Sequence, residues 1–100
     1  MSKEETFGDY IRKEREGKNL PLRKVAAYLD IDTSTLSKVE RSERPASPDY
    51  LKPLSEILQL DLKEVQSKFI ADKINKDFGG MEHLTHGLKA AEEQIKKGKK

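Results

Sequence analysis

The sequence has no cysteine, no long apolar run and little net charge. Without cysteine the chain can form neither a disulfide framework nor a thiolate zinc site, as is usual in a reducing cytosol. No apolar run approaches the length of a membrane-spanning helix, and the opening MSKEETF has no apolar core of a signal peptide. We therefore expect a cytoplasmic protein that makes no membrane contact.

The charges nearly balance, since 20 lysine and arginine residues stand against 18 aspartate and glutamate residues, a net charge of +2. The chain therefore has no large positive field, and any nucleic-acid binding must depend on where individual cations lie. A length of 100 residues with 34% hydrophobic side chains predicts one domain with a modest core.

Catalytic patterns are also missing: the sequence has no glycine-rich phosphate loop, no P-loop and no nucleophile elbow. His83 and His86 stand three residues apart beside Glu82, a spacing that two metal ligands can have. With no thiolate nearby and glycines on both sides, surface or partner-facing histidines are the better interpretation. We expect no enzyme activity, no metal, no cofactor and no small-molecule ligand.

The stretch from Leu20 to Arg41 predicts two short helices joined by a tight turn. Pro21 suits the first position of a helix, because its missing N–H would have no partner there. Asp30 ends this helix, since aspartate tolerates the left-handed conformation of a sharp turn. The apolar stripe that should face the core is Leu22, Val25, Ala26 and Leu29, and Ile31 re-enters the core after the turn.

The following helix, from about Thr33 to Glu40, has only Leu36 and Val39 as apolar anchors. Asp32 should cap it through its carboxylate. A helix of this size is unstable alone, so its neighbours must hold it. Its outer face carries the small or charged side chains Thr33, Ser34, Ser37 and Lys38.

Three segments, VAAYLDI (25–31), STLSKVER (34–41) and the leucine pattern of 51–58, resemble the Cro/phage-repressor helix-turn-helix, or XRE, family. The resemblance covers roughly Phe7 to Phe69. It implies an all-α, lambda-repressor-like five-helix bundle whose third helix lies in the major groove of double-stranded DNA. Among family members, LRKVAAYLDIDTSTLSKVER is most similar to controllers of restriction–modification operons, beside phage repressors and antitoxins.

The resemblance also implies roles for single residues. Thr33, Ser34 and Lys38 match positions that touch base edges, and Ser37 would join them. The phosphate contacts would come from Arg23, Lys24, Arg41 and Arg44. Arg15, near the end of the first helix, would pair with Glu40 in a buried bidentate ion pair. Tyr28 could reach a phosphate, although an aromatic at this spacing is more often partly in the core.

Three positions depart from the family pattern. Leu22 replaces a phosphate-binding glutamine, Asp30 replaces the glycine of the turn, and Ser42 replaces the glycine after the third helix.

The remaining helices are predicted from capping signals. Thr6 and Asp9 form a capping box before a first helix that ends near Glu16. Ser47-Pro48-Asp49 precedes a fourth helix. Either this helix begins near Tyr50, which puts Pro53 in its first turn and is the interpretation we prefer, or it is bent at Pro53. Asp61, with Glu64 reaching back, begins a fifth helix that ends by Phe78. The side chains expected to face inward from it are Leu62, Val65, Phe69, Ile70 and Ile74.

A sixth helix is predicted within residues 79–95, after the helix-turn-helix domain of residues 6–78. Its heptad stripe is Met81, Leu84, Leu88, Ala91 and Ile95. The stripe could close over its own domain or pair two subunits, with Leu84, Leu88 and Ile95 as the dimer contacts. Residues 1–5 and the basic residues 96–100 should be disordered tails.

Two functions remain open at this point. The first is a homodimeric transcriptional regulator, most simply a repressor, which reads an inverted repeat with half-sites about 34 Å apart. The residues do not distinguish repression from activation. The second is a protein-interaction module, such as an antitoxin or an accessory subunit, that uses the C-terminal apolar face.

Overall fold

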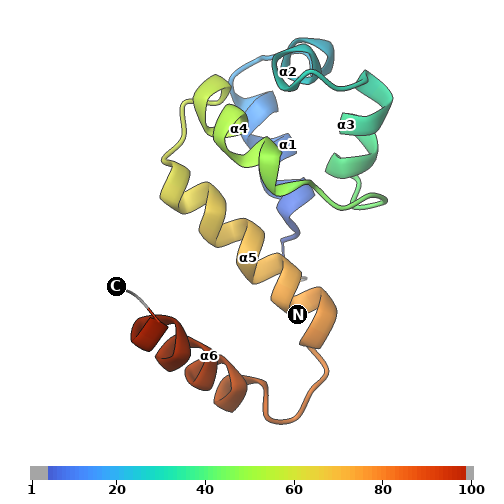
Figure 1. The fold of residues 1–100 in the computed structure, drawn as a ribbon. Helices are drawn as coiled ribbons and strands as arrows, with labels where there is room; N and C mark the ends of the chain where they lie inside the picture. The colour runs from blue at the N-terminus through green and yellow to red at the C-terminus, as the bar shows by residue number, and fades with distance from the viewer. Residues whose placement is uncertain (1–4, 99–100) are drawn as a thin grey trace.

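The computed structural model describes residues 5–98 and shows only helices in that part of the chain (Figure 1). The prediction of an all-α fold is confirmed: five helices form the bundle and its arm, and a sixth follows. The helices are α1 (Phe7–Gly17), α2 (Leu22–Leu29), α3 (Thr33–Glu40), the 3₁₀ turn η1 (Pro48–Tyr50), α4 (Leu51–Ile57), α5 (Leu62–Phe78) and α6 (Leu84–Gly98). None of them is both long and apolar enough to cross a membrane.

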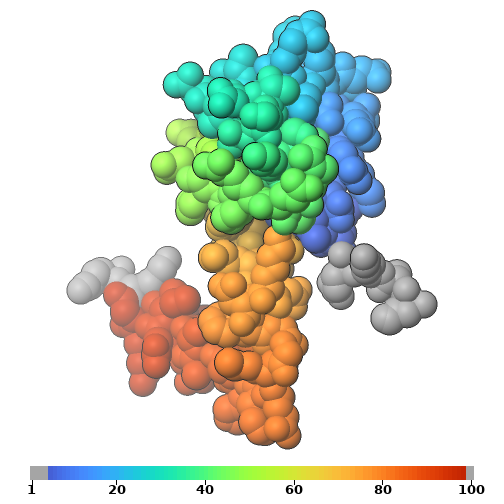
Figure 2. All heavy atoms as spheres, turned by 90° about the vertical axis from the view of Figure 1, so that its right-hand side faces the viewer, coloured from blue at the N-terminus to red at the C-terminus, as the bar shows by residue number. Residues whose placement is uncertain are grey.

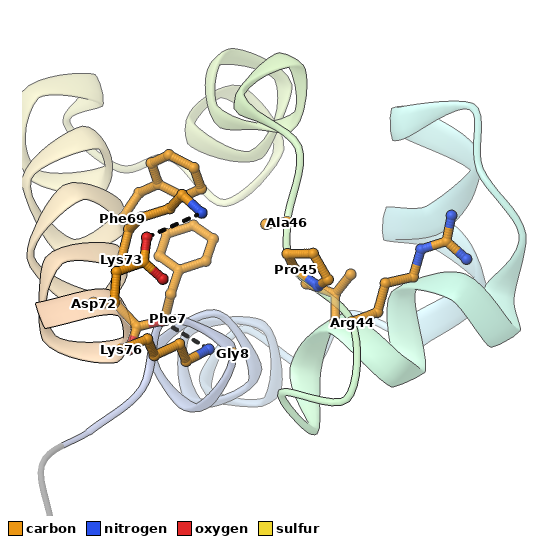
Figure 3. Close-up of a pocket in the computed structure, with 11 residues that line it drawn as sticks. Phe7, Gly8, Arg44, Pro45, Ala46, Phe69, Asp72, Lys73 and Lys76 are labelled. Atoms are coloured by element: carbon orange, nitrogen blue, oxygen red, sulfur yellow. Dashed lines mark ion pairs between the residues drawn. The ribbon is translucent and has the colours of Figure 1, made fainter.

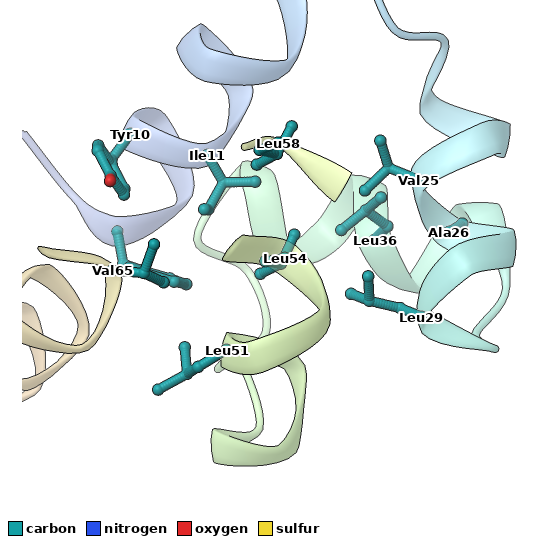
Figure 4. Close-up of a cluster of buried hydrophobic side chains, with 11 residues drawn as sticks. Tyr10, Ile11, Val25, Ala26, Leu29, Leu36, Leu51, Leu54, Leu58 and Val65 are labelled. Carbon is teal, nitrogen blue, oxygen red and sulfur yellow. The ribbon is translucent and has the colours of Figure 1, made fainter. Parts of the chain in front are cut away.

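The core lies between α1, α2, α3, α4 and the first turns of α5 (Figure 4). Each helix contributes the apolar positions of its inner face, so the side chains interdigitate at the centre. The largest fully buried side chains are Ile11, Val25, Leu36, Leu54, Leu58 and Val65. Phe69 extends this core along α5, because its ring meets that of Phe7 edge-on at a centroid distance of 5.5 Å.

Four helix ends share one turn geometry, and none of the four uses glycine. Asn19, Asp30, Ser42 and Gln59 have φ angles of 57°, 61°, 63° and 57°. After each, the next amide donates to the carbonyl five residues earlier, as in Leu20 to Arg15 (3.1 Å) and Ile31 to Ala26 (3.0 Å). This is the Schellman arrangement, in which glycine is usual because L side chains disfavour positive φ. It confirms the left-handed turn predicted at Asp30.

The helix starts differ from prediction in three details. Pro21 is the N-cap of α2 and not its first residue, and Asp32 is the N-cap of α3 but its carboxylate accepts no hydrogen bond from the helix. Asp61 does accept from the Lys63 amide at 3.1 Å, but the structure shows no return bond from Glu64. The capping box of Thr6 and Asp9 is present, with bonds of 3.0 and 3.3 Å.

The second half of α5 leaves the bundle as an arm, and α6 folds back beside it (Figure 1). The prediction that Ile70 faces inward is wrong, because 54% of this residue is exposed where no bundle helix covers the arm. Ile74 is half-buried and lines the space between α5 and α6.

The predicted tails fall mostly outside the described residues, which exclude 1–4 and 99–100. Glu5 is described and pairs with Lys13 at 2.9 Å. The prediction of disorder is wrong for residues 96–98, because they continue α6. An exposed ion pair between Lys96 and Glu92, one turn earlier at 3.7 Å, adds a little to the stability of this last turn.

Candidate nucleic-acid interface

Helix α3 is anchored on one side and open on the other. Leu36 and Val39 are 0% and 3% exposed. Thr33, Ser34 and Lys38 are exposed on the opposite side, and Ser37 is half-buried. Figure 2 looks onto the side of the molecule that carries α3, and neither α5 nor α6 covers it there. A small polar surface on a fixed helix is thus presented to solvent.

An ion pair fixes α3 to α1. The Arg15 Nε and Nη2 atoms donate to the two carboxylate oxygens of Glu40 at 2.8 and 3.0 Å, and Nη1 donates to the Leu20 carbonyl at 2.9 Å. Glu40 is 3% exposed, so this bidentate pair is shielded from solvent. The hydrogen bond to Glu40 also raises the pKa of Arg15. The pair lies where the family resemblance implied it.

Gly8 lets the two helices approach this closely. A Cβ atom at this position would overlap the backbone carbonyl oxygens of Val39 and Glu40. Since the obstacle is backbone, it could yield only if α3 moved. Sequence reasoning missed this residue, because a glycine inside a helix gives no sign of what lies opposite it.

Arg41, an expected phosphate contact, is already bound within the chain. Its Nε and Nη2 atoms lie 3.0 and 3.2 Å from the carboxylate oxygens of Glu43, and its Nη1 donates to the Ser37 hydroxyl. The hydrogen bond to Arg41 lowers the pKa of Glu43 and raises that of Arg41. Sequence reasoning missed Glu43; only the left-handed turn at Ser42 brings its carboxylate back over the end of α3.

The other cations near α3 are uncommitted. Arg23 and Lys24 are exposed on α2, Lys38 on α3 and Arg44 in the following loop. None of these four forms an ion pair with a residue in the range 5–98. They remain free to meet an anionic ligand.

Arg44 also borders a hollow between α1, α5 and the loop after α3 (Figure 3). The hollow has a volume of about 60 Å³, which suits water and not an organic ligand. The guanidinium of Arg44 points away from the other labelled residues. On the far wall Lys76 pairs with Asp72 at 3.2 Å and Lys73 with Asp77 at 3.6 Å, so these cations are engaged.

Tyr28 is half exposed on α2, and its hydroxyl donates to the Glu56 carboxylate at 3.0 Å. This bond ties α2 to α4 and raises the pKa of Tyr28. The Tyr28 side chain therefore contributes to the packing of α2 against α4 at the surface of the bundle.

The C-terminal candidates lie away from α3. His83 comes no closer than 3.9 Å to Glu82, and residues 5–98 contain no group of three potential metal ligands. Leu84 is half-buried, while Leu88 and Ile95 are 41% and 64% exposed. These three side chains lie on α6, where the expected dimer contacts were placed.

Comparisons with known proteins agree with this geometry. Residues 11–65, more than half of the chain, match the family described as Helix-turn-helix (HTH_3). A search among curated proteins found no matching sequence. Among solved structures, the clp gene regulator ClgR from Corynebacterium glutamicum has a TM-score of 0.58 at 22% identity, over 93% of this chain and 85% of that one. The likeness to ClgR concerns the fold. The chain belongs to the XRE-type helix-turn-helix family of DNA-binding regulators.

Proposed function

We propose that this protein is a homodimeric, sequence-specific transcriptional regulator that places α3 in the major groove. The observation that carries the proposal is the two-sided character of α3. Its inner side is fixed by Leu36, Val39 and the Arg15–Glu40 pair, and its outer side is polar and uncovered. A helix held in this way can enter a groove as a rigid body.

Thr33, Ser34 and Lys38 are the base-reading candidates, because all three are exposed on the outer side of α3. Hydroxyl groups donate or accept, and an ammonium can reach the O6 and N7 atoms of guanine. Ser37 is half-buried and already accepts from Arg41, so we assign it the role of positioning that side chain.

Arg23, Lys24 and Arg44 are the phosphate-binding candidates, since they flank α3 and are exposed without an ion pair to a described residue. Arg41 would join them after leaving Glu43. Contacts of this kind fix the register on DNA, and base contacts then select the sequence.

One eight-residue reading helix offers few contacts, which favours binding as a pair. Two copies related by a two-fold axis require an inverted repeat with half-sites about 34 Å apart. Occlusion of a promoter by such a pair is the simplest mode of action, which makes the protein a repressor in this proposal. Residues of α6 would join the two copies.

The test is selection of binding sites from random duplexes, followed by affinity measurements on the selected site. We expect a palindromic consensus. Lys38→Ala and Ser34→Ala should each weaken binding by about 10- to 100-fold, the value of one good base contact. Lys63→Ala, which removes an exposed cation from the start of α5, should change affinity little.

A protein-interaction module remains the second candidate, because the apolar side chains along α5 and α6 are exposed. That function would be favoured if both α3 variants bound DNA like the unaltered protein while Leu84→Asp abolished regulation in cells.

A further inference from the structure

Helices α5 and α6 enclose an open cleft with apolar walls. Figure 1 shows these two helices at the end of the molecule away from α3. The cleft has a volume of about 610 Å³. Its lining includes Ile74 and Phe78 from α5, Met81 from the connection, and Leu84, Leu88 and Ala91 from α6. Phe78, Met81 and Leu88 are 45%, 62% and 41% exposed, so the chain itself does not fill the cleft.

The exposed surface is larger than a compact monomer needs. A monomer of 11.4 kDa should expose about 5,800 Å², and this chain exposes 7436 Å², an excess of roughly 1,600 Å². Among the described residues, the second half of α5 and all of α6 contribute to it, because nearly every residue there is exposed. Its radius of gyration is 15.2 Å, against about 13 Å for a compact domain of 100 residues. A standard protein interface covers about 800 Å² on each partner, so the excess is enough for one.

Gly87 is the fourth residue of α6 and lies on the wall of the cleft. A glycine there costs about 1 kcal/mol of helix stability relative to alanine. Nothing in its own chain requires it, because a Cβ at this position would meet no atom within 4 Å. Gly87 and Ala91, one turn later, form a surface of small side chains that allows the backbone of another helix to approach closely.

Of the apolar stripe predicted on the last helix, Ile95 is the member that does not line the cleft. It is 64% exposed and follows Gly87 by eight residues, or about 12 Å along the helix. Two antiparallel α6 helices that cross at Gly87 would carry each Ile95 past the first turn of the other α6, which begins only three residues before Gly87. Ile95 would then face the connection between Phe78 and Met81. Each chain therefore carries both a protruding side chain, Ile95, and a recess that could receive it, the cleft. An isologous interface requires both on the same chain.

We propose that α6 of a second copy fills this cleft, with the two copies clasping each other and their α6 helices crossing at Gly87. The proposal rests on the homodimer proposed above and specifies how its subunits meet. It explains together the exposed apolar walls, the glycine near the start of α6 and the exposed Ile95 beyond the cleft.

The first test is the mass of Gly87→Leu in solution, with Ala90→Leu as the matched control. Ala90 lies on the outer side of α6, between His86 and Glu93. The unaltered protein and Ala90→Leu should have twice 11.4 kDa in sedimentation equilibrium. Gly87→Leu should keep its circular dichroism spectrum and dissociate about 10- to 100-fold more readily, because a crowded contact costs about 1–3 kcal/mol.

The second test uses the absence of cysteine from the chain. Gly87→Cys should oxidise to a covalent dimer, since a close crossing brings the two Cβ atoms within disulfide range, and Ala90→Cys should not. A dimer that tolerates Gly87→Leu and gives no Gly87→Cys cross-link would overturn the clasp and leave the homodimer standing. A protein that stays monomeric even on its selected DNA would overturn both. A monomer whose cleft binds another protein would show that the occupant is not a second copy.

Discussion

At the scale of single residues, Tyr10 has an unusual environment. Its hydroxyl is buried and has no hydrogen-bond partner among the described residues. The ring lies 6.1 Å from that of Phe7, with the Lys68 ammonium 5.3 Å from its centroid. Burial, reinforced by the carboxylates of Glu64 and Glu14, raises the pKa of Tyr10 to about 12. The group therefore stays neutral in the folded protein well above the pH at which a free tyrosine ionises.

Tyr10→Phe should raise the free energy of unfolding by about 1 kcal/mol at neutral pH, because it removes a buried hydroxyl without a partner. In the unfolded chain Tyr10 ionises near pH 10, and in the folded chain at about 12. The unfolded state thus loses its proton first, and the stability of the unaltered protein should fall between these values. Urea titrations at pH 8 and pH 11 test this. A variant whose stability falls as steeply as that of the unaltered protein would contradict it.

Glu43→Gln should tighten DNA binding several-fold. It frees Arg41 from its carboxylate partner. It also removes a negative charge close to Lys38, which slightly lowers the pKa of Glu43. One additional phosphate contact should steepen the plot of log affinity against log salt by about 0.9. Glu93→Gln makes the same change of charge on α6 and serves as the control. Equal affinities and salt slopes for the two variants would show that Glu43 does not compete with phosphate.

The residue scale shows what a sequence can and cannot predict. The Arg15–Glu40 pair was expected because the resemblance matched both positions to paired positions in relatives. The Arg41–Glu43 pair was not, since it depends on the positive φ of Ser42. Asp30 was expected to be left-handed, and Asn19 is of a residue type that favours this conformation at a helix end. Nothing in the local sequence marks Gln59 as a Schellman position.

At the scale of elements, α3 depends on its neighbours for its orientation. It is eight residues long, and its side-chain cap forms no hydrogen bond. Its position is therefore set by the core and by the contact with α1 at Gly8. This contact predicts that a change on α1 should affect the reading helix.

Gly8→Ala should destabilise the protein by about 1–3 kcal/mol, because its Cβ would overlap the carbonyls at the end of α3. If α3 moves to relieve the overlap, DNA affinity should fall even where the variant is fully folded. Gly17→Ala is the matched control on the same helix, since a Cβ there meets no atom within 4 Å. Thermal unfolding and DNA titration at low temperature separate the two effects. A Gly8→Ala variant as stable as Gly17→Ala would show that the two helices can separate at little cost.

The boundaries of α1 to α5 followed from capping signals and apolar spacing to within one or two residues, down to Pro53 as the third residue of α4. The sixth helix was predicted within residues 79–95, but α6 begins at Leu84 and leaves Met81 outside it. The set of α5 residues that face the core could not be predicted in the same way, because apolar periodicity does not show where along a helix the bundle ends. Val65 and Phe69 pack on the bundle, but Ile70 belongs to an arm that extends beyond it. The spacing of Leu84 and Leu88 predicted an apolar face on α6, and it could not show that α5 leaves this face uncovered.

At the scale of the whole molecule, α3 and the cleft between α5 and α6 lie at different ends (Figures 1 and 2). A partner in the cleft would leave the polar face of α3 open. DNA binding and pairing of subunits are then compatible, and the occupancy of a double site should rise more steeply with protein concentration than that of a half-site.

Leu88→Asp should separate these two activities, because it places a carboxylate on the apolar wall of the cleft without touching the bundle. The variant should bind an isolated half-site as the unaltered protein does and lose the gain in affinity on the full inverted repeat. Inserting five base pairs between the half-sites, about half a helical turn, should remove the same gain from the unaltered protein. Gel-shift titrations on the half-site, the full site and the lengthened site measure all three effects.

If Leu88→Asp bound the full site as tightly as the unaltered protein, cooperation between two copies would not depend on this cleft. If it also lost the half-site, the substitution would have acted through the bundle, and thermal unfolding of the free variant would show this directly.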